Sequence, residues 1–268
     1  MRYINILFWN LNKKILYESI EKICVEHDID VLILCEYEKI DIDHMIRRLK
    51  ENDLNYEVGN NLTIGRVIIL HKLGYNLKSI KDDKYYSVCK ISRKDINILL
   101  FGVHLPSKLY TRGQDQYSVA AKCNKEIEKK EEEFGINNTI VIGDFNMNPF
   151  EDGMVSSDGF HGVMSQDVAF KCNRTVYGEK RKLFYNPMWH YMGNVITNVM
   201  GTYYYNNSGV ISYHWNTFDQ LLIRPSLIKN FDIENLKIID SIGEKSLIRN
   251  SKPDNKEYSD HLPLFFKI

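Results

Sequence analysis

The chain has 268 residues, of which 44% are hydrophobic and 26% are charged. This length and composition suffice for a buried core over most of the chain, which excludes disorder as a description of the whole protein. Basic and acidic residues number 35 each, so the formal net charge is zero and no global positive field attracts a polyanion. Any contact with nucleic acid must therefore come from a local patch.

The five cysteines are widely spaced and include no Cys-x-x-Cys pair, which disfavours a disulfide framework and a thiolate zinc site. We expect them to be small buried hydrophobic residues in a reducing compartment. The chain opens MRYINILFWN, without the ordered regions of a secretory leader, and no apolar run is long enough to cross a bilayer. These features predict a cytoplasmic protein with no membrane partner.

Short β-rich runs alternate with longer charged stretches, which is typical of an α/β protein. In the first half we expect strands at Tyr3–Trp9, Val31–Cys35, Val67–His71, Tyr85–Ile91 and Ile96–His104. The periodicity predicts helices at Lys13–His27, with Ile15, Ser19, Ile20 and Ile23 inward, and at Asp43–Asn52.

The second half opens with a predicted long helix at Gln114–Phe134, whose outer face is rich in lysine and glutamate. A strand at Thr139–Ile142 then leads into the polar turn DFNMNP, and residues 148–200 are expected to form loops and short helices. Further strands are predicted at Thr202–Tyr205, Phe218–Ile223 and Leu264–Ile268. Because no short repeat or flexible linker interrupts the pattern, we expect one domain over residues 1–268.

Polar side chains stand where apolar strands end. They are Asn10, Glu36, His104, Asp144 and Asn146 after strands, and Asp260 with His261 just before the last one. In open α/β sheets ligands collect at the carboxyl ends of strands, so these positions can converge on one cleft. Taken singly, each is a common turn residue or a hydrogen-bonded structural histidine.

Taken together, these positions resemble the endonuclease/exonuclease/phosphatase superfamily over residues 9–263. That family includes exonuclease III-like repair nucleases, pancreatic-type deoxyribonucleases, neutral sphingomyelinases and inositol polyphosphate 5-phosphatases. The matching motifs are Trp9-Asn10, Glu36, His104-Leu105-Pro106, Gly143-Asp144-Phe145-Asn146, Phe218-Asp219-Gln220-Leu221 and Ser259-Asp260-His261-Leu262-Pro263. The resemblance implies an α/β fold, a four-layer α/β-β/α sandwich of two mixed β-sheets flanked by helices, with the active cleft at one end.

Hydrolysis of a phosphate ester needs a cation, a positioned water and a proton donor for the leaving oxygen. Glu36 and Asp260 are hard oxygen ligands and Asn10 offers an amide oxygen, which favours Mg²⁺, with Mn²⁺ as the alternative, over Zn²⁺. The resemblance implies that these three positions hold or surround the metal; the alternative is that the two carboxylates cap a turn and a loop. Asn12 stands where the family often has aspartate, which favours one metal over two.

His261 is the predicted acid/base centre because imidazole titrates near neutrality. The resemblance implies Asp219 as its carboxylate partner, Asp144 as the group that orients or deprotonates the attacking water, and Asn146 as the amide that holds a phosphate oxygen. His104 replaces the tyrosine of the exonuclease III-like enzymes, which points away from abasic-site repair. It could donate a hydrogen bond to the phosphate or protonate the leaving group, but the sequence identifies no carboxylate to orient it.

Substrate-binding residues are less constrained by the sequence. Lys108 and Arg112 follow His104 closely and could reach a phosphate, although both could equally be solvated surface. The basic run Lys171–Lys182 and a set of aromatic residues could form a groove that pairs backbone charge with base stacking, or could cover a loop and a core edge. The aromatic residues are Tyr185, Trp189, Tyr191, Tyr203, Tyr204, Tyr205, Tyr213 and Trp215, the last being the predicted substrate contact.

We therefore expect a Mg²⁺-dependent hydrolase of phosphodiester bonds, with a nuclease acting on DNA or RNA as the first hypothesis and nucleic acid as its partner. The second hypothesis is a phosphatase or phosphodiesterase acting on a small phosphorylated metabolite or a lipid headgroup. A third, of another class, is a catalytically silent binding module. The presence of every ligand and dyad residue argues against the third.

Overall fold

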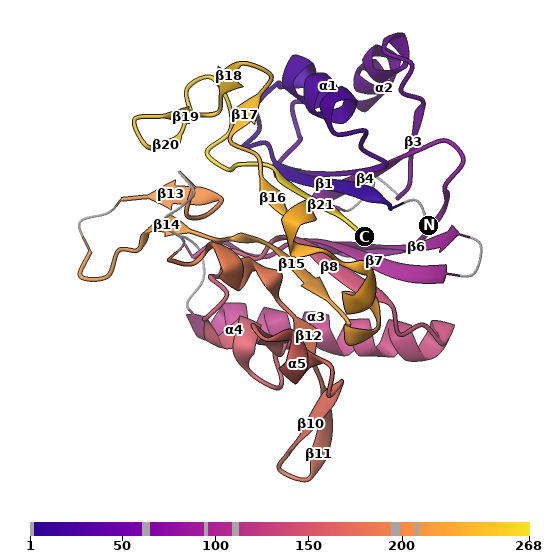
Figure 1. Ribbon diagram of the computed structural model, residues 1–268, viewed down its shortest axis with the longest axis vertical. Helices are drawn as coiled ribbons and strands as arrows, with labels where there is room; N and C mark the ends of the chain where they lie inside the picture. The colour runs from indigo at the N-terminus through magenta and orange to yellow at the C-terminus, as the bar shows by residue number, and fades with distance from the viewer. Residues whose placement is uncertain (1–2, 61–64, 94–95, 109–112, 194–198, 207–208) are drawn as a thin grey trace.

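Two large sheets pack face to face and helices cover their outer faces, as Figure 1 shows for the computed structural model. The structure describes residues 3–60, 65–93, 96–108, 113–193, 199–206 and 209–268. The arrangement confirms the expected four-layer sandwich of two mixed sheets. Within the described residues, no helix is both long and apolar enough to pass through a bilayer.

The first sheet has the strand order β16-β21-β1-β2-β4-β3. Its strands are β1 (Asn5–Asn10), β2 (Val31–Cys35), β3 (Tyr56–Val58), β4 (Val67–Lys72), β16 (Lys237–Ile238) and β21 (Leu264–Lys267). β1 and β2 are parallel, and β21 and β4 flank them in antiparallel pairing. Every residue of β2 is buried because helices α1 (Tyr17–Glu26) and α2 (Ile42–Glu51) cover the outer face of this sheet.

The second sheet has the strand order β5-β6-β7-β8-β15-β12-β9. Its strands are β5 (Asn76–Asp82), β6 (Tyr86–Arg93), β7 (Ile96–His104), β8 (Thr139–Asp144), β9 (Gly162–Val163), β12 (Phe184–Tyr185) and β15 (Asp219–Ile223). β7 and β8 are parallel, and β15 pairs antiparallel with β8. The outer face carries α3 (Gly113–Phe134), α4 (Asp152–Val155) and α5 (Gln166–Ala169).

Small elements connect these layers. They are the hairpins β10 (Asn173–Val176) with β11 (Glu179–Lys182), β13 (Tyr203–Tyr205) with β14 (His214–Asn216), β17 (Ser241–Ile242) with β18 (Lys245–Ser246) and β19 (Ile248–Arg249) with β20 (Lys252–Pro253), and the 3-10 helices η1 (Pro187–Tyr191), η2 (Pro225–Asn230) and η3 (Ile233–Asn235). The β10–β11 hairpin projects from the body, and β13–β14 lies apart from it along another edge (Figure 1).

Alternate residues of β7 face two different cores. Leu100 packs in the core between the sheets, whereas Leu99 and Phe101 pack in the core beneath α3. Gly102 stands on the inter-sheet side, where a Cβ atom would lie 2.9 Å from Val67 Cγ1. The absence of a side chain at this position therefore lets the two sheets approach each other closely where they lead to the site.

The first helix is shorter than the sequence pattern predicts. It begins at Tyr17, and Ile15, predicted to face the core, is 61% exposed. Asn12 and Lys13 adopt left-handed backbone angles (φ 46° and 57°), and the Lys13 N–H donates to Glu36 O at 2.8 Å. This segment is therefore a turn fastened to the end of β2. The expectation that the cysteines are buried was wrong for Cys172, which is exposed. It is confirmed for the other four.

A buried ion pair joins α3 to the residue that follows β15. Arg224 Nε donates to Glu131 Oε1 at 2.7 Å, and Lys182 Nζ donates to Glu131 Oε2 at 2.9 Å. The Arg224 guanidinium also lies 3.7 Å from the centroid of the Phe184 ring. Burial raises the pKa of Glu131, but Arg224 and Lys182 outweigh it, so the pKa is lowered overall.

We expect Arg224→Met to lower the free energy of unfolding at pH 7 by about 3 kcal/mol, because it leaves the Glu131 carboxylate buried without its main partner. The pair stabilises the wild type above the unfolded-state carboxyl pKa, and that stability is lost as the pH falls through the lowered folded-state value. The deficit should therefore shrink in acid, as measured by urea unfolding against pH. Lys22→Met, which breaks an exposed pair with Glu18, is the matched control and should change little. Equal losses in both variants, or a deficit independent of pH, would contradict this assignment.

Candidate active site

Strand register brings five of the predicted residues to one end of the sandwich. In the second sheet His104 pairs with Asp144 across β7 and β8, and Asp144 pairs with Asp219 across β8 and β15. In the first sheet Asn10 ends β1 and Glu36 follows β2, its parallel neighbour. The carboxyl ends of the parallel strands in both sheets thus meet at the place where an α/β sheet collects ligands.

His261 enters this end of the sandwich from the loop before β21. Its Nδ1 lies 2.8 Å from Asp219 Oδ2, and both side chains are buried. Trp9 Nε1 donates to the His261 carbonyl at 2.9 Å, and the His261 N–H donates to Ser259 Oγ at 3.1 Å. The Tyr203 ring packs against the imidazole with 4.7 Å between centroids. Backbone and ring are therefore both held, and the predicted His–Asp pair is present.

The charges around His261 favour the imidazolium form. Burial lowers the pKa of His261, but the charge and hydrogen bond of Asp219, followed by the charge of Asp144, raise it to about 10. Burial also raises the pKa of Asp144, whose Oδ2 lies 4.0 Å from His261 Nε2. The imidazole thus has one nitrogen on Asp219, and Nε2, near Asp144, remains for a further partner.

His104 has two carboxylate neighbours that its position in the sequence does not reveal. Its Nε2 lies 3.5 Å from Glu36 Oε1 and 3.8 Å from Asp144 Oδ2. Burial lowers its pKa to about 3, helped by the charge of Arg66. A neutral imidazole beside two carboxylates can donate one hydrogen bond, consistent with the expected contact to a phosphate oxygen.

Asn10 presents its amide nitrogen, rather than its oxygen, to the acidic cluster. Nδ2 donates to Asp144 Oδ2 at 3.0 Å and lies 3.5 Å from Glu36 Oε1. Its Oδ1 accepts from the Asn12 N–H at 2.9 Å. In this arrangement Asn10 holds the carboxylates in place, and its amide would have to turn over before the oxygen could bind a metal.

Three carboxylates, Glu36, Asp144 and Asp260, line one cavity, and the described lining residues include no cysteine. Such a set of hard oxygen donors fits Mg²⁺ or Mn²⁺. Asp144, Asp219 and His261 also bring one potential ligand atom each to within 4.8 Å of one another. Because Asp219 Oδ2 and His261 Nδ1 already bond to each other, the carboxylates of Glu36 and Asp260 are the better candidates for a cation.

The turn after β8 depends on a glycine. Gly143 has φ 152°, and a Cβ atom there would lie 1.9 Å from the carbonyl oxygen of Val103. The next residue, Asp144, accepts at Oδ1 from the Asn146 N–H at 2.8 Å. Asn146 is left-handed (φ 52°) and donates Nδ2 to Leu105 O at 3.0 Å, which leaves one of its two amide hydrogens for a ligand.

The cavity has a volume of about 700 Å³. The described residues that line it are Asn12, Lys13, Glu36, Ser107, Lys108, Asp144, Asn146, Tyr203, Tyr205, Ile211, Ser212, Tyr213, Asn216, Phe218, Asp260 and His261. On one side, Tyr203 stacks on both Tyr205 and Phe218, with 6.4 and 5.3 Å between centroids. We call these three rings the aromatic wall. From the sequence no role is predicted for Phe218, although its position directly before Asp219 could have indicated a place in the site.

The predicted substrate contacts divide between the cavity and other places. Lys108 lines the cavity, lies over the Phe218 ring at 5.1 Å and pairs with Glu151. Arg112 falls outside the described residues. Trp215 packs on the inter-sheet core and edge-on against Tyr204, and it is not among the described residues lining the cavity.

The basic run Lys171–Lys182 does not form the predicted groove with the aromatic residues. It folds mainly into the β10–β11 hairpin, which projects away from β13–β14 (Figure 1). Lys182 is fixed to Glu131, and Arg174 Nε donates to His161 Nε2 at 2.7 Å, so side chains at the base of the hairpin are held by the body. Tyr185 and Tyr191 are buried in the core. The groove hypothesis was wrong because these ties direct the hairpin elsewhere.

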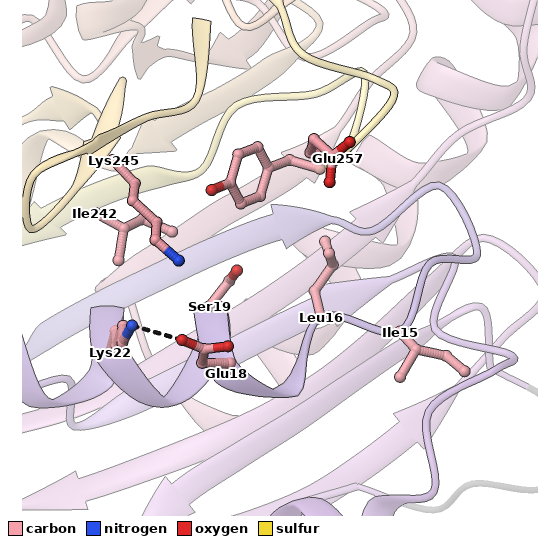
Figure 2. A pocket seen from close by; sticks show the side chains of 9 residues that line it. Ile15, Leu16, Glu18, Ser19, Lys22, Ile242, Lys245 and Glu257 are labelled. Carbon is pink, nitrogen blue, oxygen red and sulfur yellow. Dashed lines mark hydrogen bonds and ion pairs between the residues drawn. The ribbon is translucent and has the colours of Figure 1, made fainter.

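A second cavity, of about 360 Å³, lies between α1 and the β17–β18 hairpin (Figure 2). Its lining residues are Ile15, Leu16, Glu18, Ser19, Lys22, Ile242, Lys245, Glu257 and Tyr258. The Glu18 and Lys22 side chains pair with each other at 2.6 Å. Charges of both signs face this cavity and none is buried as His261 is, so we assign no chemistry to it.

Solved structures similar to the chain cover nearly all of it. D. rerio TDP2 complexed with single-strand DNA product is 14% identical, with a TM-score of 0.58, over 100% of this chain and 99% of that one. The human Nocturnin catalytic domain with bound sulfate anion is 12% identical, with a TM-score of 0.58, over 99% and 93%. An endonuclease/exonuclease/phosphatase family protein from Bacteroides thetaiotaomicron is 14% identical, with a TM-score of 0.55, over 99% and 97%.

This chain has the endonuclease/exonuclease/phosphatase fold. Scans against protein-family models and a search of curated proteins found no match. The fold implied by the sequence motifs is thus confirmed, whereas function has to be argued from the site itself.

Asp219→Asn removes the charge that raises the pKa of His261, while the burial that lowers it remains. We expect the pKa of His261 to fall from about 10 to below about 7 in metal-free protein, measured by NMR titration of the imidazole carbons. The pKa of His261 is higher in the folded protein than in the unfolded chain, so the His261–Asp219 pair stabilises the wild type fully below about pH 6.5. This stabilisation is lost as the pH rises through about 10. Asp260→Asn, which removes a weaker contributor, should shift the titration less. A titration that Asp219→Asn leaves unmoved would refute the pairing.

Glu36 occupies left-handed backbone (φ 49°), which asparagine tolerates better than glutamate. We expect Glu36→Asn to raise the thermal midpoint of the metal-free protein, since it relieves strain and removes one charge from an acidic cluster, and to weaken Mn²⁺ binding measured by calorimetry. Glu38→Asn removes an equal charge from an exposed position two residues on and is the control. Unchanged Mn²⁺ binding in Glu36→Asn would remove Glu36 from the metal site.

Proposed function

We propose that the protein is a metal-dependent hydrolase of phosphodiester bonds and a member of the endonuclease/exonuclease/phosphatase superfamily. The observation that carries this proposal is the convergence of the buried His261–Asp219 pair with the carboxylates of Glu36, Asp144 and Asp260 at one cavity. A catalytically silent binding module would have no need to bury so many titratable groups around a single opening.

Glu36 and Asp260 would hold Mg²⁺ or Mn²⁺, which, when bound, neutralises charge on the non-bridging phosphate oxygens. Asp144, whose pKa burial raises, is suited to orient the attacking water and accept its proton. His261, held as imidazolium by Asp219, can donate from Nε2 to a phosphate oxygen or to the departing oxygen. Asn10 keeps Asp144 in position through the amide hydrogen bond. His104 and Asn146 supply neutral donors to the phosphate.

A nuclease acting on DNA or RNA is the substrate class that the cavity favours. The aromatic wall offers π faces for unpaired bases, and Lys108 stands beside it with its ammonium over Phe218. D. rerio TDP2, which shares the fold, is described with a single-strand DNA product. His104, which replaces the tyrosine of the exonuclease III-like enzymes, supports a role other than abasic-site repair. We propose a cytoplasmic, single-domain enzyme that uses one metal.

The test is turnover of a substrate panel with Mg²⁺ or Mn²⁺: single- and double-stranded DNA, RNA, bis(4-nitrophenyl) phosphate and the corresponding monoester. We expect wild-type turnover of phosphodiesters, and a loss of about 10² to 10⁴ in kcat for His261→Ala because its proton transfer is removed. His190→Ala, at an exposed histidine, should retain full activity.

Each other outcome of the panel has a defined meaning. Absence of turnover on every substrate, or equal turnover by His261→Ala, would overturn the enzymatic proposal. Turnover confined to the monoester or to small phosphorylated molecules would replace the nuclease by the phosphatase alternative while keeping the hydrolase.

A further inference from the structure

Basic side chains lie near the end of β7, on the side of the active site away from the aromatic wall, and of these only Lys13 is among the described residues that line the cavity. Lys13 lines the cavity, Arg66 directly precedes β4, and Lys84 lies just before β6. The Arg66 guanidinium carbon lies 5.6 Å and the Lys84 ammonium 5.1 Å from the centroid of the Tyr85 ring. We call Lys13, Arg66, Lys84 and Tyr85 the cationic rim. In the sheet orders, β4 and β6 lie on one side of β2 and β7, whereas β15 and the aromatic wall lie on the other.

The cationic rim is directly joined to the catalytic groups. The Tyr85 carbonyl accepts from the His104 N–H at 2.8 Å, which sets the ring beside the end of β7. A ligand on the rim would therefore lie next to whatever group contacts His104.

The rim also brings three cations together in a chain with zero net charge. In the part of the chain that the structure describes, none of its three cations forms an ion pair with a carboxylate. Lys108, across the cavity, differs because it pairs with Glu151. Arg66 and Lys84 face one shared ring, so each raises the potential at the other. Such a patch is best satisfied by an anion from outside the chain.

We infer that the cationic rim binds a second phosphate of the substrate, adjacent to the phosphate that is cleaved, and that the substrate is a single-stranded oligonucleotide. The strand crosses the cavity with an unpaired base on the aromatic wall, the scissile phosphate at His261 and Asp144, and the neighbouring phosphate on the rim. This inference rests on the proposed function. Recognition by the rim then requires a substrate with more than one phosphate, and a compound with a single phosphodiester cannot make this contact.

Binding without hydrolysis tests the rim separately from catalysis. The affinity of the full chain for a short fluorescein-labelled oligothymidylate is measured by anisotropy in EDTA over a range of salt concentrations. We expect Arg66→Ala/Lys84→Ala to weaken binding about 10- to 30-fold at roughly 0.1 M salt. The slope of log K against log salt should fall by about 0.7, the value for one lost phosphate contact on a single strand.

Two matched variants control for charge and folding. Lys171→Ala/Lys180→Ala removes two exposed cations from the β10–β11 segment and should leave both affinity and slope unchanged. The exchange Arg66→Lys/Lys84→Arg keeps both charges and should bind within about twofold of wild type, because the contact is mainly ionic. For Arg66→Ala/Lys84→Ala, kcat/KM should fall further on the oligothymidylate than on bis(4-nitrophenyl) phosphate, which has one phosphate.

Several results would overturn the inference. They are no binding of oligothymidylate by the wild type, the same affinity in the alanine pair, an equal loss in the hairpin control, or an equal loss of kcat/KM on the oligothymidylate and on bis(4-nitrophenyl) phosphate in the alanine pair. If the wild type binds the oligonucleotide through the rim but hydrolyses nothing in the presence of metal, the proposed function fails while the rim stands.

Discussion

The hydrogen-bonded charge pair of Asp219 and His261 is the interaction around which the rest of the site is arranged. Each group alone would be a buried charge, and each makes the other tolerable in the interior. The pair also joins the two sheets, because Asp219 begins β15 in the second sheet and His261 leads into β21 in the first. A contact needed for chemistry therefore also fixes the relation between the layers that carry the other site residues.

Two glycines allow the two sheets to take this position relative to each other. Gly102 allows the sheets to approach each other near β4. Gly143 allows the chain to turn where any side chain would clash with the Val103 carbonyl. Glu36 and Asn146 accept left-handed backbone at the neighbouring strand ends. Strain and close approach are thus concentrated where the carboxylates converge, which is the usual place for stability to be given up in favour of function.

The parts of the site predictable from sequence are those set by strand ends. Asn10, Glu36, His104 and Asp144 could be found because a strand's period and its last residue are local properties, and register then brings them together. Apart from the His261–Asp219 pair, which the family resemblance implies, side-chain partners were not predictable, because they depend on pairing between distant segments. The orientation of the Asn10 amide, the carboxylates facing His104 and the exposure of Ile15 all follow from such contacts.

The positions of charged side chains in space also depend on contacts between distant segments. A basic run in the sequence is therefore a poor guide to where a polyanion binds. The longest basic run, Lys171–Lys182, attracted the sequence-based hypothesis, yet the body holds Arg174 and Lys182 on a hairpin away from the cavity. Arg66 and Lys84 belong to no long basic run and meet because β4 and β6 bring them to the same tyrosine. A polyanion responds to potential in space rather than to runs along the chain. Among the described residues, two cations without carboxylate partners near the His104 end of β7 are therefore a stronger indication of a phosphate path than a longer run whose charges are already partly engaged.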